Sequence, residues 1–374
     1  MSWSRFVAIV LKEFRQIRRD RLTFAMMVGV PIIQLVLFGF AINTDPKRLP
    51  MAVVIAEHSE FSRSLIAGLE NSGYFKVSRR VGGDAEGNRL LARGDVQFVL
   101  VVPADFSRKL IRGERPAVLV AADATDPAAT GNALAALNGI GRQSLSHDLI
   151  GPLAGLQSTD SPFDVRVQRR YNPEGLSRYN VVPGLIGVIL TMTMVMMTAL
   201  AMTRERERGT MENLLATPAR PFEVMVGKIV PYILIGYVQV AVILVASRLL
   251  FDVPMVGSLA LLSLALIVFI AANLAVGFTF STIARNQLQA MQLTFFFFLP
   301  SMLLTGFMFP FRGMPEWAQA IGQVLPLTHF LRIVRGILLK GNGAPEMLPS
   351  LWPIALFLMV AGALALMRYR RTLD

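Results

Sequence analysis

The densest group of charged residues in the chain alternates in sign over five consecutive positions: Arg204, Glu205, Arg206, Glu207 and Arg208. On a helix, residues three apart lie on one face, so Arg204 can pair with Glu207 and Glu205 with Arg208. Acidic residues contribute little to membrane orientation, so a cluster that served topology alone would not need them. Exposed charges of both signs on a rigid element are suited to docking in a groove on another protein.

The residues that follow this cluster predict a break and then a second short helix. Gly209 ends the first helix, and Thr210 can cap a second one whose first turn holds Glu212, where the helix dipole favours a negative charge. Pro218 ends this second helix. Residues 204–227 are therefore expected to form a helix–break–helix elbow.

Side chains that carry out chemistry in enzymes are scarce. The chain has no cysteine, which excludes disulfides, thiolate metal sites and a cysteine nucleophile. Of its three histidines, His58 and His147 are isolated in the sequence, which is typical of surface or packing residues. A nucleotide-phosphate loop is missing, because Gly227 and Lys228 are followed by Ile229 and lack the upstream glycine. We therefore expect no catalytic residue, no metal site and no cofactor bound by this chain.

Charge is distributed very unevenly along the sequence. Only 17% of the residues are charged and 53% are hydrophobic, with a mean hydropathy of +0.52. A soluble domain usually carries about 25% charged residues. Uncharged runs approach or exceed the roughly 20 residues that span a bilayer, where only an internally bonded backbone is stable. Six transmembrane helices are expected, at residues 22–42, 179–203, 228–250, 258–282, 286–310 and 347–367.

The basic residues predict the orientation of these helices. If the N-terminus lies inside, the short inner segments hold 15 Lys and Arg residues and the short outer segments hold 5. This asymmetry favours both termini in the cytoplasm. The net charge of +12 is thereby explained by membrane topology, and nucleic-acid binding is not expected.

The segment between the first two expected helices, residues 43–178, is long enough to bury its own core. Strand-like and helix-like runs alternate in it, which predicts an extracytoplasmic α/β domain with a mixed sheet. The expected strands lie at residues 51–56, 75–81, 97–102, 117–121 and 165–169, and the expected helices at 61–71, 86–93 and 130–150. The fold class is thus a polytopic α-helical membrane protein with an inserted α/β domain.

Three further segments lie at the membrane surfaces. Residues 1–21 predict an amphipathic helix on the cytoplasmic face, and residues 368–374 form a cytoplasmic tail. Residues 311–346 are too charged for an ordinary span and predict outer re-entrant or interfacial helices. There His329 and Arg332 share a helix face, and a water-facing structural role is favoured over a contact in an outer gate.

The segment RERERGTMENLLATP closely resembles the cytoplasmic signature of ABC-2 type transporter permeases. The N-terminal KEFRQIRRDR, the segment NPEGLSRYNVVPGLIG and the late PLTHFLRIVRGILLKG are also similar to that family, in particular to its bacterial drug-export type with one large extracytoplasmic domain. In the family, the matching elbow carries a coupling helix seated in the ATPase subunit. The resemblance assigns this coupling role to Arg204, Glu205, Arg206, Glu207, Arg208, Gly209, Thr210, Met211, Glu212 and Leu215.

The resemblance also implies the partners of the chain. They are two copies of an ABC ATPase, which bind ATP and Mg, and a second permease copy, identical or paralogous. A periplasmic adaptor, an outer-membrane channel and membrane lipid are compatible partners. The location implied is the bacterial inner membrane.

The expected function is the export of an apolar or amphiphilic substrate by an ATP-driven permease. Candidate residues of the substrate path are Gln34, Met194, Met197 and Phe297. Two alternatives stay open at this point. An ion-gradient-driven secondary transporter would normally need ionisable groups at mid-membrane, which the uncharged runs lack. A membrane-anchored sensor would need fewer spans than the sequence provides.

Overall fold

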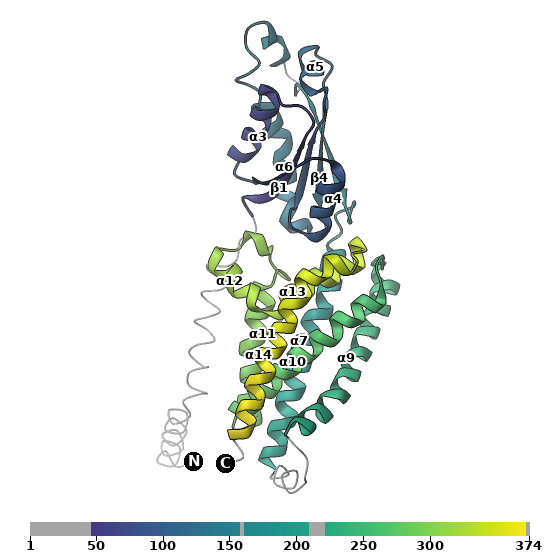
Figure 1. Cartoon of the computed structure of the whole chain (residues 1–374), viewed down its shortest axis with the longest axis vertical. Coiled ribbons are helices and arrows are strands. Elements are labelled where there is room, and N and C mark those ends of the chain that lie inside the picture. Colours follow the sequence, from purple (N-terminus) through teal and green to yellow (C-terminus); the bar gives the residue numbers. More distant parts are fainter. Residues whose placement is uncertain (1–45, 158–160, 209–220, 372–374) are drawn as a thin grey trace, which may run out of the picture.

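The computed structural model describes residues 46–157, 161–208 and 221–371. A sheet domain, built from the N-terminal part of these residues, lies at one end of a set of long helices (Figure 1). The first expected transmembrane helix, the N-terminal amphipathic helix, the end of the tail and residues 209–220 of the elbow lie outside the described residues. The α/β domain thus stands on the N-terminal side of the described long helices.

Five strands form the sheet in the order β2-β1-β3-β4-β5. Their bounds are β1 Leu49–Ile55, β2 Phe75–Val81, β3 Phe98–Val102, β4 Ala117–Asp123 and β5 Asp164–Arg170. All neighbours are parallel except β3 and β4, which are antiparallel. The sheet is therefore mixed, and all five strands fall where the sequence predicts them.

Helices cover both faces of this sheet. Met51 and Val53 of β1 point into a cluster with α3 (Glu60–Asn71), α5 (Phe106–Ile111) and α6 (Pro127–Gln143), while Ala52 and Val54 join a second cluster with α4 (Asp84–Arg93). Side chains alternate between the two faces of a strand, so this separation follows from the sequence of β1. The sequence did not predict α5, and α6 ends seven residues before the expected limit at residue 150.

Five helices in the described residues are long and apolar enough to cross a membrane. They are α7 Ser177–Glu207, α9 Pro221–Phe251, α10 Leu259–Ile283, α11 Gln287–Leu304 and α14 Ala344–Arg371. The α11 helix ends at Leu304, although the sequence predicted a span through residue 310. Gly306 has a φ of 84°, a left-handed conformation that only glycine adopts without strain, and it turns the chain away from the helix axis.

The α10 helix lies at the centre of the helical part, in contact with both α7 and α14. Small residues permit this close approach, since a Cβ atom at Gly277 of α10 would lie 2.5 Å from the carbonyl oxygen of Val195 on α7. Elsewhere on α10, Phe269 stacks on Phe330 of the segment after α11, with ring centroids 4.0 Å apart. Close packing through small residues is the main attraction available between helices in a bilayer.

Two short helices connect α11 to α14. They are α12 (Glu316–Val324) and α13 (Pro326–Arg335), and a single π-helical turn, η4 (Gly336–Lys340), continues α13. The chain then reverses at Gly341, which has a φ of 71°. Gly187 on α7 lets α13 approach closely, because a Cβ atom there would lie 2.6 Å from Leu327. The α13 helix is therefore packed on α7 and α10, whereas α12 packs on α11 and α13.

We expect Gly277→Ala to lower the thermal unfolding midpoint of the detergent-purified protein, because the new methyl group overlaps backbone atoms of α7. Overpacking of this kind costs about 1–3 kcal/mol. Gly362→Ala on α14 is the matched control, since a Cβ atom there meets nothing within 4 Å. An equal midpoint for both variants would contradict the close approach of α7 and α10.

Candidate functional site

The end of α7 carries the charged cluster found in the sequence. Glu207 accepts hydrogen bonds from the backbone N and the side-chain amide of Gln287. Arg206 donates to the carbonyl oxygen of Ala284 at 3.3 Å, and Arg204 donates to the side chain of Gln287 at 3.4 Å. The charged end of α7 is thus bonded to the connection between α10 and α11.

The other predicted coupling residues are placed as follows. Glu205 and Arg208 lie on the same last turns of α7, and Arg208 is its C-terminal cap. Gly209, Thr210, Met211, Glu212 and Leu215 lie outside the described residues. Their role in coupling stays a prediction from the sequence.

The residues predicted for a substrate path contact other apolar side chains where the structure describes them, and their role in transport stays a prediction. Met194 is fully buried and, with Met197, belongs to the cluster that joins α7 to α10. Phe297 packs in a different cluster, with its ring edge-to-face on Phe280 at 6.0 Å. The structure therefore does not bring Met194 and Phe297 together, and Gln34 lies outside the described residues.

The two residues predicted for the outer face differ in exposure. Arg332 is exposed, and its guanidinium lies 5.2 Å from the ring centroid of Phe311. His329 is buried, and its Nε2 atom lies 2.8 Å from the carbonyl oxygen of Gln323. The water-facing role is therefore wrong for His329, because α13 packs this side of the helix against α12.

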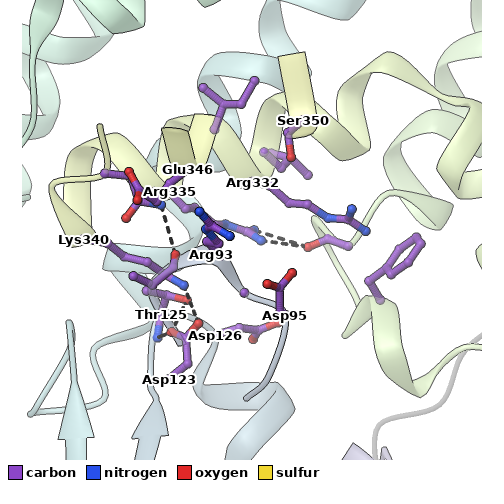
Figure 2. A pocket seen from close by; sticks show the side chains of 18 of the residues that line it. Arg93, Asp95, Asp123, Thr125, Asp126, Arg332, Arg335, Lys340, Glu346 and Ser350 are labelled. Atoms are coloured by element: carbon purple, nitrogen blue, oxygen red, sulfur yellow. Dashed lines mark hydrogen bonds and ion pairs between the residues drawn. The ribbon is translucent and has the colours of Figure 1, made fainter. Parts of the chain in front are cut away.

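A charged cavity of about 330 Å³ lies where the sheet domain meets the helices, and we call it the junction cavity. Figure 2 shows its charged side chains, which come from the end of β4, from the region after α4 and from α13, η4 and α14. The sequence analysis did not find this site. The charged residues that line it are Arg93, Asp95, Asp123, Asp126, Arg312, Arg332, Arg335, Lys340 and Glu346.

A buried ion pair joins the two sides of the junction cavity. The ammonium group of Lys340 in η4 contacts the carboxylate of Asp123 at the end of β4, and the side chains are only 8% and 9% exposed. The other carboxylate oxygen of Asp123 accepts hydrogen bonds from the backbone N of Thr125 at 3.1 Å and from its hydroxyl at 2.7 Å. Both charges are therefore compensated inside the protein.

The C-terminal end of α4 is a second point of attachment. Its last carbonyl groups carry the negative end of the helix dipole and can accept hydrogen bonds from outside the helix. Lys340 donates to the carbonyl of Leu91 at 3.2 Å, Asn342 to that of Ala92 at 3.0 Å, and Arg312 to that of Gly94 at 3.1 Å. Three donors from the helical part, two of them cationic, thus form hydrogen bonds with the C-terminal end of a helix of the sheet domain.

Asp126 and Arg335 are two further charges of the junction cavity, and both are partly buried. Asp126 caps α6 by accepting from the backbone N of Ala129 at 3.3 Å, and it accepts from Asn180 of α7 at 3.2 Å. Burial raises the pKa of Asp126, and the nearby Arg335 opposes this effect. Both terminal nitrogens of Arg335 donate hydrogen bonds to the carbonyl oxygen of Gly306 at 3.2 Å. Burial lowers the pKa of Arg335.

The described residues hold no group of three or more His, Asp or Glu side chains that could bind a metal ion. The only sequence signal for the junction cavity was the unusual charge of residues 312–346. Its partners on the sheet domain could not be identified, because 217 residues separate Asp123 from Lys340.

Residues 21–367 match the family model described as ABC-2 family transporter protein. The chain belongs to this ABC-2 transporter family.

Named relatives of this ABC-2 chain cover its whole length. It is 29% identical to the "Probable multidrug ABC transporter permease YbhS" of Escherichia coli K12, with 100% of this chain and 99% of the relative aligned. It is 26% identical to the similarly named YbhR of the same strain, over 98% of each chain. It is also 27% identical to "Inner membrane transport permease YhhJ", over 97% of this chain and 96% of the relative. These relatives support a membrane subunit of an ABC exporter.

We expect Lys340→Met and Asp123→Asn to lower the unfolding midpoint of the purified ABC-2 chain strongly, because each leaves one buried charge without its partner. Breaking a buried pair in this way costs about 3–5 kcal/mol. The double variant should lose less than the sum of the single losses. Lys109→Met is the matched control, since its ion pair with Asp105 is largely exposed. A loss at Lys340 no larger than that at Lys109 would refute the attachment.

The opposite effect is expected for Asp126→Asn. A carboxyl group whose pKa is raised by folding binds its proton more tightly in the folded state, so stability falls as the pH rises above the unfolded value. Asparagine cannot ionise, yet it keeps an oxygen for Ala129 and Asn180. The variant should unfold at a higher temperature than the wild type at pH 8, and the difference should shrink at pH 5. A difference that grows at pH 5 would count against the raised pKa.

Proposed function

We propose that this chain is the membrane-spanning permease subunit of an ATP-binding-cassette exporter. It moves an apolar or amphiphilic compound, drug-like or lipid-like, out of the cytoplasm or the inner membrane. A separate ATPase subunit supplies the energy and binds ATP and Mg. Membership of the ABC-2 family and the multidrug permease names of the relatives support this proposal.

The proposed topology has six spans, with the α/β domain inserted between the first and the second and exposed outside the cytoplasm. Both termini lie in the cytoplasm, and two permease copies, identical or paralogous, assemble with two ATPases. A periplasmic adaptor and an outer-membrane channel can extend this assembly. The distribution of basic residues and the five apolar helices of the described part support this arrangement.

The bonded end of α7 is the observation that supports coupling most directly. Arg204, Arg206 and Glu207 hold the end of α7 on the connection between α10 and α11. A force applied by an ATPase to the elbow at residues 204–227 would therefore act on three helices together. Because α7 also packs on α13, the same movement would reach the outer side of the helical part.

The proposal predicts that a C-terminally tagged chain, extracted in mild detergent, co-purifies with an ABC ATPase in fixed stoichiometry. Glu212→Arg should abolish this association, because it reverses a charge in the expected coupling helix. Glu174→Arg reverses an exposed charge of the sheet domain and should leave the association intact. Both variants should insert in the membrane as the wild type does, which a Western blot of washed membranes checks.

A clean homo-oligomer without ATPase under several gentle conditions would contradict the proposal. Export that stops when ion gradients are collapsed at constant ATP would favour a secondary transporter instead.

A further inference from the structure

Three arginine side chains lie together on one edge of the junction cavity. Arg312 belongs to the short turn before α12, while Arg332 and Arg335 lie one turn apart on α13 and thus on the same side of that helix. We call these residues the three-arginine edge. Burial and the nearby charge of Arg312 lower the pKa of Arg332 to about 10. Guanidinium groups stay protonated in proteins, so the edge carries three positive charges.

Most of the acidic groups of the junction cavity are bonded elsewhere. Asp123 is engaged by Lys340 and Thr125. Asp126 accepts from Ala129 and Asn180, and Glu346 accepts from the backbone N of Gly343 at 3.1 Å. Asp95 is close enough to Arg312 to favour its charged form. Asp126 and Asp123 act on Arg335 in the same way, but neither forms an ion pair with it, because both carboxylates are bonded to other groups.

The three guanidinium groups are bonded to neutral oxygen atoms. Arg312 donates to the carbonyl of Gly94, Arg335 to that of Gly306, and Arg332 makes a long contact of 3.5 Å with the side chain of Gln323. None of the three forms an ion pair with a carboxylate in the described ranges. The Nε atom of Arg335 is buried and has no hydrogen-bond partner there.

A guanidinium group offers five donors in a planar fork that matches the oxygens of a phosphate or carboxylate. Charge-assisted hydrogen bonds of this kind are about twice as strong as those to neutral acceptors. An oxyanion at the three-arginine edge would use the donors that the protein leaves open and would reduce the repulsion between the cations. The free space of about 330 Å³ exceeds the size of a phosphate group.

An apolar surface lies beside this edge. On α12, Trp317, Ile321 and Val324 are spaced by four and three residues, share one face, and are 41%, 48% and 67% exposed. Tryptophan is enriched where a membrane meets water, and an amphipathic helix can lie in that plane. Gln323, which contacts Arg332, is the neighbour of Val324 on the same helix.

We propose that the three-arginine edge binds the oxyanionic head group of an amphiphile, a phosphate or carboxylate, while its apolar chain lies along the exposed face of α12. This proposal rests on the proposed function in one respect, because the proposed topology is what places the exposed face of α12 at the outer leaflet of the membrane. It extends that function by assigning negative charge to the head group of a bound lipid or substrate.

Binding can be measured without transport. The purified full chain in neutral detergent is titrated with phosphatidylglycerol, with phosphatidylcholine of the same acyl chains and with inorganic phosphate, and native mass spectrometry counts the bound molecules. We expect phosphatidylglycerol to bind at least about tenfold more tightly than phosphatidylcholine, which corresponds to about 1.4 kcal/mol. The double variant Arg312→Gln/Arg332→Gln should lose this preference, and Arg332→Lys should retain part of it.

Arg248→Gln removes an exposed arginine near the end of α9 and is the matched control, with unchanged binding expected. Equal affinity for the two lipids, or a preference that survives in the double variant, would overturn the proposal. Tight binding of inorganic phosphate without a preference between the two lipids would show a site for a free oxyanion. That result would overturn the proposal that the ligand is an amphiphile. If the chain binds the lipid but no ATPase co-purifies with it, the proposed exporter function would be contradicted. The proposed lipid-binding site would still be supported.

Discussion

The orientation of the sheet domain on the described helices depends on the burial of two opposite charges between them. Removing an ammonium and a carboxylate from water is expensive, and their attraction repays the cost only while the geometry is kept. Lys340 and Asp123 meet this condition, because further hydrogen bonds to Leu91 and from Thr125 satisfy their remaining groups. Any rotation of the sheet domain on α13 would separate the pair and leave both charges poorly solvated. The pair therefore specifies one orientation.

A continuous series of packed elements connects the charged end of α7 with this pair. The α7 helix contacts α10 and α13, α13 continues into η4, and η4 holds the end of α4. Gly187 and Gly277 keep the distances between these helices short. Because closely packed helices move as units, the sheet domain is not a loosely tethered appendage. It is attached firmly to the ends of the long helices that lie next to it.

Local patterns were sufficient to predict the strands and the long apolar helices. Along β1, Met51 and Val53 alternate with Ala52 and Val54, and the two pairs lie on opposite, buried faces of the sheet. The long apolar helices were predicted from runs of uncharged residues. Contacts over long distances in the chain were beyond such patterns, as with Asp123 and Lys340. The role predicted for Met194 and Phe297 stays a prediction, because apolar side chains that line a path and those that pack a core look alike in the sequence. The early end of α11 required the backbone conformation of Gly306.

The π-helical turn at Gly336–Lys340 has a consequence for variation in this region. A π turn accommodates one residue more than an α turn, so its five residues rotate the chain by about as much as four residues of an α-helix. Loss of a single residue here would convert the turn to α-helix and leave the following residues on nearly the same side of the axis. Insertion of a single residue has no such compensation. It would turn the residues that follow by about 100° and exchange the face that meets the sheet domain.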